Sequence, residues 1–184
     1  MSTRRAGRRR LRVGGFVALL SLVAYVLVGL PFIVFPRTDA RPKHADVVLV
    51  LGPLSEKRIA LAKQLLADGT VDRMMWSATI TTHAQYPLLQ ECWTTPGLIC
   101  ERPSPATTEG EGQMLQQQAA ARGWTSAVVI TQTAHITRAR TILSRCFAGR
   151  LTVLDSGDPP VGGWVYQYAY QTAATVKLWF TRPC

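Results

Sequence analysis

The hydrophobic and polar residues of this chain form one long apolar run, followed by a region in which short apolar segments alternate with amphipathic ones. The apolar run, VGGFVALLSLVAYVLVGLPFIVF, covers residues 13–35 and contains no charged side chain. As an α-helix rising about 1.5 Å per residue it would be roughly 35 Å long, enough to cross a hydrocarbon core of about 30 Å. Pro31 lies near its end, so we expect the helix to kink or loosen there. The run predicts a transmembrane helix.

Beyond the run, residues 36–44 are polar and contain proline, and we interpret them as a linker to one domain over residues 45–184. Apolar segments predict strands at 47–52, 71–78, 98–101, 126–132 and 151–155. Amphipathic spacing predicts helices at about 55–69, 86–93, 107–123, 135–147 and 163–181. Strands that alternate with helices imply βαβ units. The pattern therefore predicts a three-layer α/β domain with a mostly parallel sheet, preceded by one transmembrane helix.

Positive charge is concentrated before the apolar run. The formal net charge is +10, but six arginines lie within the first 12 residues, and the rest of the chain has 15 basic and 11 acidic residues. Basic residues beside a membrane span favour the cytoplasmic side. We therefore predict a cytoplasmic basic tail at 1–12, a signal anchor at 13–35 in the plasma membrane, and an extracytoplasmic domain. Membrane topology accounts for the arginines, so we expect a lipid bilayer and no nucleic acid as partner.

A cleavable signal peptide is the alternative to an anchor. Its apolar region is typically about 7–15 residues and is followed by a site with small residues. The present run is longer, and Thr38-Asp39-Ala40 is a poor cleavage site. We therefore favour the uncleaved anchor.

Four cysteines follow the apolar run: Cys92, Cys100, Cys146 and Cys184. Their even number suits an oxidising compartment, but four cysteines allow three pairings. A bond between Cys92 and Cys100 would close a short loop, and a bond between Cys146 and Cys184 would tie a helix to the last residue. Four reduced thiols remain the alternative.

Candidate functional residues follow the predicted strands at their carboxyl ends, where parallel sheets collect ligands. Gly52 ends the first strand, although Pro53 removes one amide donor from any phosphate loop there. Arg58 lies in the first turn of the next helix, where a cation opposes the helix dipole. It could form an ion pair with an acid or bind an anion.

Two carboxylates flank the loop after the third strand. Glu101 and Glu109, with Ser104 and Thr107 between them, would suit general acid–base chemistry or cation binding if they converge on one pocket. Alternatively, Glu109 is only a first-turn acid that stabilises the helix.

Thr131, His135 and Arg138 follow the fourth strand. His135 lies at the beginning of a helix, so its imidazole can face the same crevice, although a single His is often structural. The three histidines of the chain are scattered, and no metal site is predicted.

The last predicted helix is rich in aromatic residues. Tyr166, Tyr168 and Tyr170 are spaced by two and cannot share one face of a helix, so some of them must be exposed. The segment, with Trp164 and Trp179, could be a docking surface or a membrane-facing belt, but we expect the other aromatic residues to pack in the core.

Four motifs follow one another over residues 45–140: A-D-x-x-x-x-L-G, R-x-x-x-A, I-x-E-x-x-S-x-x-T-x-E and V-x-T-x-x-x-H-x-x-R-A. In this order they resemble the YdcF/SanA/ElyC-like family, the bacterial domain of unknown function 218. The matching residues are Ala45, Asp46, Leu51, Gly52, Arg58, Ala62, Ile99, Glu101, Ser104, Thr107, Glu109, Thr131, His135, Arg138 and Ala139.

The resemblance implies a Rossmann-like fold and a role at the bacterial cell envelope, in barrier function or in peptidoglycan or lipid-carrier metabolism. Members often carry an N-terminal anchor, and one is reported to bind S-adenosylmethionine. Two positions depart from the family pattern. The glycine-rich turn after the first strand is here Gly52-Pro53, and the usual Asn after the motif Glu is Gly110.

Two hypotheses follow. In the first, the protein is an enzyme acting on a phosphorylated or lipid-linked envelope intermediate, with Arg58 and Arg138 holding an anionic group and His135 or Glu109 transferring a proton. Glu101 is the other predicted catalytic residue, and the ligand-binding set is Gly52, Arg58, Ser104, Thr107, Thr131 and Arg138. In the second, the protein is a non-catalytic envelope factor that binds an anionic ligand or a protein partner. An outward-facing domain has little access to ATP or S-adenosylmethionine, so no cofactor is assigned.

Overall fold

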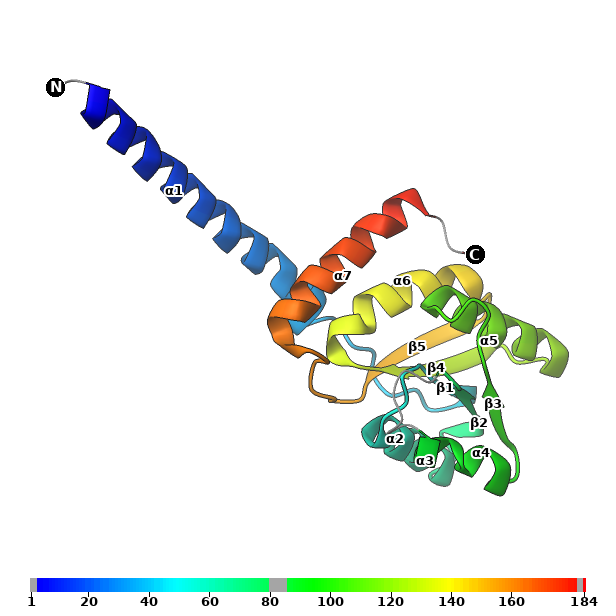
Figure 1. Ribbon diagram of the computed structural model, residues 1–184. Coiled ribbons are helices and arrows are strands. Elements are labelled where there is room, and N and C mark those ends of the chain that lie inside the picture. Colours follow the sequence, from blue (N-terminus) through cyan, green and yellow to red (C-terminus); the bar gives the residue numbers. More distant parts are fainter. Residues whose placement is uncertain (1–2, 80–85, 182–183) are drawn as a thin grey trace.

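The protein is described by a computed structural model that covers residues 3–79, 86–181 and 184 (Figure 1). The first two residues of the predicted basic tail lie outside the described residues. Figure 1 shows one long helix leaving an α/β domain as an isolated rod.

The long helix is α1 (Thr3–Gly29), and it continues as a π-helical turn, η1 (Leu30–Val34). The change of helix type occurs around Pro31, as the sequence predicts, because proline cannot donate an intrahelical bond. Residues Arg12–Val34 have a mean hydropathy of 2.6 and are almost entirely unburied, so this helix is long and apolar enough to span a membrane. It is not a core helix of the domain.

The five strands described for residues 45–79, 86–181 and 184 belong to one parallel sheet. They are β1 (Ala45–Val50), β2 (Val71–Ser77), β3 (Leu98–Glu101), β4 (Ser126–Thr131) and β5 (Arg150–Asp155). Their order is β3-β2-β1-β4-β5, and every neighbouring pair is parallel. This arrangement is Rossmann-like and confirms the predicted fold class.

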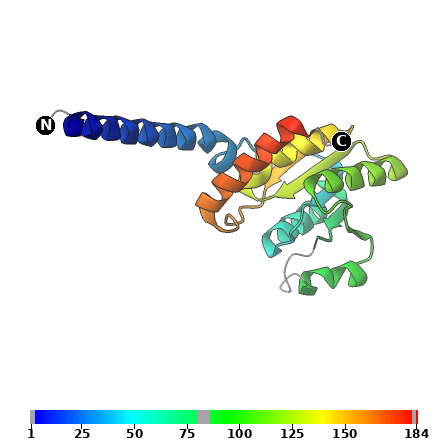
Figure 2. The same ribbon diagram turned by 45° about the horizontal axis from the view of Figure 1, so that its top comes forward.

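Helices cover both faces of the sheet (Figures 1 and 2). One face packs against α2 (Glu56–Ala67), α3 (Tyr86–Leu89) and α4 (Glu91–Thr94), and the other packs against α5 (Thr108–Arg122) and α6 (Ile136–Cys146). Successive residues of β1 alternate between the two cores, since strand side chains point to opposite faces. The 3₁₀ turn η3 (Thr133–His135) precedes α6.

The last helix, α7 (Gly163–Phe180), does not join either core. It crosses the domain end of α1, where the Tyr25 hydroxyl lies 2.8 Å from the Thr172 hydroxyl and the Tyr168 hydroxyl donates to the Val26 carbonyl at 3.0 Å. The expectation that its tryptophans pack in the core is wrong, because Trp164 is 40% and Trp179 is 75% exposed.

Both cysteine pairs considered in the sequence are present. Cys92 is bonded to Cys100 and Cys146 to Cys184, and no described cysteine is free. The alternative of four reduced thiols is therefore wrong. The second bond joins the end of α6 to the last residue of the sequence.

The segment between α1 and the sheet is attached to the domain rather than free. The Asp39 carboxylate accepts hydrogen bonds from the Val153 amide of β5 and from Arg140 of α6. Closer to α1, the Thr137 hydroxyl donates to the Phe32 carbonyl at 2.8 Å. These contacts fix the position of the domain relative to the end of the apolar helix.

Candidate functional site

The candidate site lies beyond the carboxyl ends of β1 and β4, the two central strands. The helix that follows β1, α2, covers one face of the sheet, and the helix that follows β4, α6, covers the other. In parallel sheets, ligands collect where consecutive connections leave the sheet in opposite directions. The side chains that meet there come from the β1–α2 turn, from α5 and from the β4–α6 turn.

Glu111 is the buried carboxylate of this cluster of side chains. It is 4% exposed, and its Oε1 accepts a hydrogen bond of 2.7 Å from the Gly52 amide. Burial raises the pKa of Glu111 to about 7, although bonds from Ser77 and Gly52 and the nearby charges of Arg58 and Arg138 act in the opposite direction. A carboxyl that titrates near neutrality can both accept and donate a proton.

His135, at the end of η3, contacts α5 at Thr108, one helical turn before Glu111. Its Nδ1 is 3.0 Å from the Thr131 hydroxyl and its Nε2 is 3.3 Å from the Thr108 hydroxyl. Burial, together with the positive charges of Arg138 and Arg58, lowers the pKa of His135 well below 6.5. The imidazole is therefore neutral, and both of its nitrogens are oriented by hydroxyl groups.

Arg58 forms an ion pair and does not face this cluster as a free cation. Its Nε donates to Asp158 Oδ2 at 2.8 Å, and its Nη1 donates to the carbonyls of Leu51 and Pro53. Asp158 also accepts from the hydroxyls of Ser55 and Ser156, so its carboxylate oxygen is surrounded by donors. Of the two roles considered for Arg58, the structure contains the ion pair with an acid.

Arg138 is different. Its Nε donates to Gln171 Oε1 of α7 at 2.9 Å, and its guanidinium lies 5.6 Å from the ring centroid of Tyr170. Within the described part of the chain, no carboxylate comes within ion-pair distance of it. Burial lowers the pKa of Arg138, while Tyr170 and Glu111 raise it. A half-buried guanidinium without a paired carboxylate is suited to hold an anionic group of a ligand.

The residues predicted from the β3–α5 loop do not join this cluster. Ser104 and Thr107 are exposed, and the Thr107 hydroxyl accepts from the Gly110 amide as the N-cap of α5. Glu101 accepts a hydrogen bond from Gln118 at 2.6 Å on the edge strand. The Glu109 carboxylate accepts from the backbone amide of Cys184.

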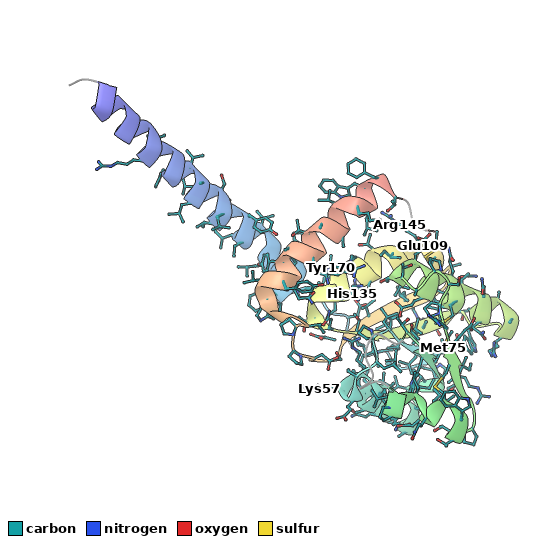
Figure 3. All side chains as sticks on the ribbon, viewed as in Figure 1. Lys57, Met75, Glu109, His135, Arg145 and Tyr170 are labelled. Atoms are coloured by element: carbon teal, nitrogen blue, oxygen red, sulfur yellow. A yellow bond between two sulfur atoms is a disulfide. The ribbon has the colours of Figure 1, made fainter. Side chains whose placement is uncertain are left out.

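Glu109, which belongs to α5, lies beside the end of α6, whereas His135 lies at the beginning of α6. Figure 3 shows Glu109 near Arg145 in the last turn of that helix and His135 at the beginning of it. The structure therefore brings together Gly52, Arg58, Thr131, His135 and Arg138 of the predicted set, and leaves Glu101, Ser104, Thr107 and Glu109 outside.

Sequence reasoning missed Glu111, although a signal was present. Glu111 is four and eight residues before the core positions Leu115 and Ala119, so it lies on the buried stripe of α5. Glu109 is on the polar stripe with Gln113 and Gln116. The helical periodicity of α5 therefore distinguishes Glu111 on the buried stripe from Glu109 on the polar stripe, whereas the spacing of the motif does not.

Two glycines, Gly52 and Gly110, allow close packing here. A Cβ at Gly52 would lie 2.8 Å from Thr79 Cβ, and a Cβ at Gly110 would lie 1.9 Å from the Pro105 carbonyl oxygen. Position 110 therefore has no room for a side chain in this loop. The Gly52 amide donates to Glu111, so it is already engaged and does not form part of an open phosphate loop.

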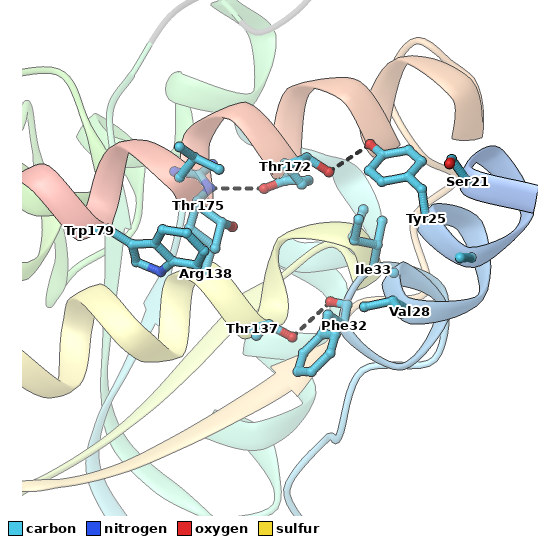
Figure 4. A pocket seen from close by; sticks show the side chains of 15 residues that line it. Ser21, Tyr25, Val28, Phe32, Ile33, Thr137, Arg138, Thr172, Thr175 and Trp179 are labelled. Atoms are coloured by element: carbon cyan, nitrogen blue, oxygen red, sulfur yellow. Dashed lines mark hydrogen bonds between the residues drawn. The ribbon is translucent and has the colours of Figure 1, made fainter. Parts of the chain in front are cut away.

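An apolar groove borders the site on the side of α1 (Figure 4). Its volume is about 630 Å³, and it lies between α1, α7 and the beginning of α6. The walls include Ala24, Val28, Val176 and Trp179, and Arg138 is among the residues that line it. Arg138 thus lies between the polar cluster and an apolar cavity beside the α1 helix.

The described residues contain no group of three His, Cys, Asp or Glu side chains that could hold a metal ion. What the cluster offers is a carboxyl that titrates near neutrality, a neutral imidazole and a guanidinium. Together these groups can bind an anion and transfer a proton beside it.

The fold and the site define the class: an α/β protein with a Rossmann-like sheet, two disulfides and one apolar helix of membrane-spanning length. Comparison with known proteins finds no protein-family model, no curated protein and no solved structure that matches the chain.

Proposed function

We propose that the protein is a membrane-anchored cell-envelope enzyme of the YdcF/SanA/ElyC-like type, which acts on a phosphorylated or lipid-linked envelope intermediate. The observation that carries this proposal is the arrangement of Arg138 beside Glu111 and His135. Arg138 has no ion-pair partner among the described residues, and its charge acts both on a carboxyl of raised pKa and on a neutral imidazole.

In this proposal Arg138 binds the phosphate or another anionic group, and Glu111 transfers the proton. A pKa of about 7 gives Glu111 comparable populations of both protonation states at neutral pH. His135 positions Thr108 and Thr131, whose hydroxyl groups bond its two nitrogens. Arg58 keeps the β1–α2 turn in place through Asp158.

The extracytoplasmic location is part of the proposal. Two disulfides are typical of an oxidising compartment, and basic residues before the apolar helix favour a cytoplasmic N-terminus. Because no described cysteine is free, a single added cysteine can report topology without removing the native ones.

The topology experiment uses Gln117→Cys, at an exposed position of α5, and a membrane-impermeant maleimide on intact cells. We expect labelling of Gln117→Cys before lysis and labelling of a Thr3→Cys control only after lysis. Protection of the Gln117→Cys thiol in intact cells would place the domain in the cytoplasm and overturn the proposal.

The activity experiment uses the full chain in lipid nanodiscs with polyprenyl phosphate and polyprenyl diphosphate as probes. Loss of a general acid–base group lowers turnover by about 10²–10⁴-fold. Glu111→Gln should therefore abolish measurable phosphate release but retain binding, and Arg138→Gln should weaken binding. Turnover by Glu111→Gln at the wild-type rate would exclude the proton-transfer role.

A non-catalytic factor that binds an anionic ligand is the second candidate. It is favoured by the fact that Glu111 and both nitrogens of His135 already have hydrogen-bond partners within the protein. Under this alternative the wild-type chain binds the probe without releasing phosphate, and only Arg138→Gln changes the result.

A further inference from the structure

α7 has the reverse of the pattern expected for a helix on a water-facing surface. Its two buried residues are Gln167 and Gln171, at 2% and 3% exposure, whereas Val165, Trp179 and Phe180 are mostly exposed. Lys177 is its single charged residue. A helix on the surface of a soluble domain turns its apolar face inward, and one that lies at a bilayer turns it outward.

The buried glutamines explain why this orientation is stable. Gln171 Nε2 donates to Gln167 Oε1 at 2.9 Å, Gln167 Nε2 donates to the Val161 carbonyl at 2.6 Å, and Arg138 donates to Gln171. The polar face of α7 is therefore satisfied by the domain, since buried amides need partners. The apolar face has no such cover among the described residues.

Contacts with α1 place α7 beside the apolar helix. The bonds from Tyr25 to Thr172 and from Tyr168 to the Val26 carbonyl join α7 to residues within the span Arg12–Val34. The two helices diverge from this crossing (Figure 1). If α1 spans the bilayer, lipid chains surround it before and after the point where it contacts α7. These chains then reach the space between the two helices.

The groove occupies that space. It is lined on one side by Ser21, Tyr25 and Phe32 of the apolar segment and on the other by Thr172 and Thr175 of α7 (Figure 4). Its volume of about 630 Å³ is within the range of roughly 300–1,000 Å³ common for small-molecule sites. An apolar cavity of this kind is filled more favourably by hydrocarbon than by water.

We infer that the groove between α1 and α7 binds the hydrocarbon chain of an anionic lipid from the outer leaflet, with the charged head group at Arg138. One wall of the groove is the membrane-spanning helix itself, so lipid is the molecule that reaches it. The placement of the head group at Arg138 rests on the proposed function, which gives Arg138 an anionic ligand. Of the two substrate classes considered there, this inference favours lipid-linked molecules over free phosphorylated sugars. The chain site is argued from the groove alone.

The test places the full chain in nanodiscs that contain phosphatidylglycerol with a diazirine in one acyl chain. After photolysis, peptide mass spectrometry maps the adducts. We expect adducts at Val176 and Trp179 inside the groove, and at Phe180, which is exposed outside it and reports general contact with the bilayer. Absence of adducts from α7 would overturn the inference.

Two variants that fill the groove make the test specific. Thr175→Trp and Ala24→Trp occupy it from opposite walls, and Ala173→Trp is the matched control on the exposed side of α7. We expect each filling variant to lose labelling at the groove residues and to keep labelling at Phe180, with Ala173→Trp unchanged. Loss of labelling at Phe180 in parallel, or full groove labelling in both filling variants, would mean ordinary bilayer contact and would overturn the chain site.

An uncharged probe separates the chain site from the head-group site. Diacylglycerol with the same diazirine chain, which has no phosphate, should label the groove about tenfold less than phosphatidylglycerol, the ratio expected for one charge-assisted hydrogen bond. Arg138→Gln should remove this difference. Equal labelling by both probes in the wild-type chain would overturn the assignment of Arg138, and with it the anionic ligand of the proposed function, while sensitivity to the filling variants would still support the chain site.

Discussion

Two arginines lie near Glu111 on opposite faces of the sheet, and their surroundings differ. Arg58 on α2 is paired with Asp158 at 2.8 Å and also donates to two backbone carbonyls. Arg138 on α6 has an amide and an aromatic ring as neighbours but no carboxylate at ion-pair distance among the described residues. The same residue type is therefore structural on one side and available to a ligand on the other.

The largest effect is expected from breaking the Arg58 pair. In Asp158→Asn the guanidinium stays buried without its counter-charge, and removal of one partner of a buried pair typically costs about 3–5 kcal/mol. Urea unfolding of the full chain in detergent micelles, followed by near-UV circular dichroism, measures this loss in the free energy of unfolding. Asp72→Asn is the control, because Asp72 forms an exposed pair with His44, which is worth little. Similar results for the two variants would show that the buried pair does not stabilise the fold.

The next effect concerns the pH dependence of stability through Glu111. Its pKa is raised from 4.5 to about 7, so the folded chain binds this proton more tightly than the unfolded chain. The stabilising contribution is fully present below pH 4.5 and is lost as the pH rises through 7. At 1.36 kcal/mol per pKa unit, the loss is about 3 kcal/mol.

Glu111→Gln isolates this contribution, because the amide stays neutral and its oxygen can still accept from Gly52. We expect the free energy of unfolding of the variant to increase relative to that of the wild type as the pH is raised from about 5 to about 8. A constant difference between the two chains over this range would show that Glu111 titrates at its ordinary pKa.

The fold was predictable to a large extent because its signals are local. The apolar run and the alternation of strands and helices appear in the sequence within short distances. The cysteine pairing was left open by the sequence, and the Cys146–Cys184 bond spans 38 residues. The attachment of Asp39 to β5 was not predictable, since it is a contact across more than 100 residues made by a segment of linker composition. The same applies to the strand order, which depends on long-range pairing.

The site was predicted only in part, because spacing along the sequence does not define which way a side chain points. His135 and Arg138 were found by their position after β4. Glu109 was chosen where Glu111 is the buried acid, and the helical phase of α5 decides between them. For α7 the usual rule that aromatic residues pack inside gave the wrong result, because the helix has its glutamines buried instead.

A smaller effect on stability is expected from His135, which lies near Arg138. Burial and the neighbouring arginines lower its pKa well below 6.5, so the folded chain binds this proton less tightly than the unfolded chain. Its contribution to stability is therefore present above pH 6.5 and is lost as the pH falls through the lowered pKa. Nitrogen-15 NMR of the His135 imidazole should show a neutral ring as the pH is lowered through 6.5. Protonation of this ring near pH 6.5 would contradict the burial of His135.

The smallest effect is the one that distinguishes the two arginines most directly. Arg138→Met removes a charge that has no paired carboxylate, and the side chain of Met can still pack in the groove. The free energy of unfolding should then fall by about 1–3 kcal/mol, the scale of leaving the buried Gln171 Oε1 without its donor. Arg58→Met, the matched variant, leaves Asp158 buried and unpaired and should lose about 3–5 kcal/mol. If both variants were equally destabilising, Arg138 would be a structural residue like Arg58, and the site would have no cation reserved for an anionic ligand.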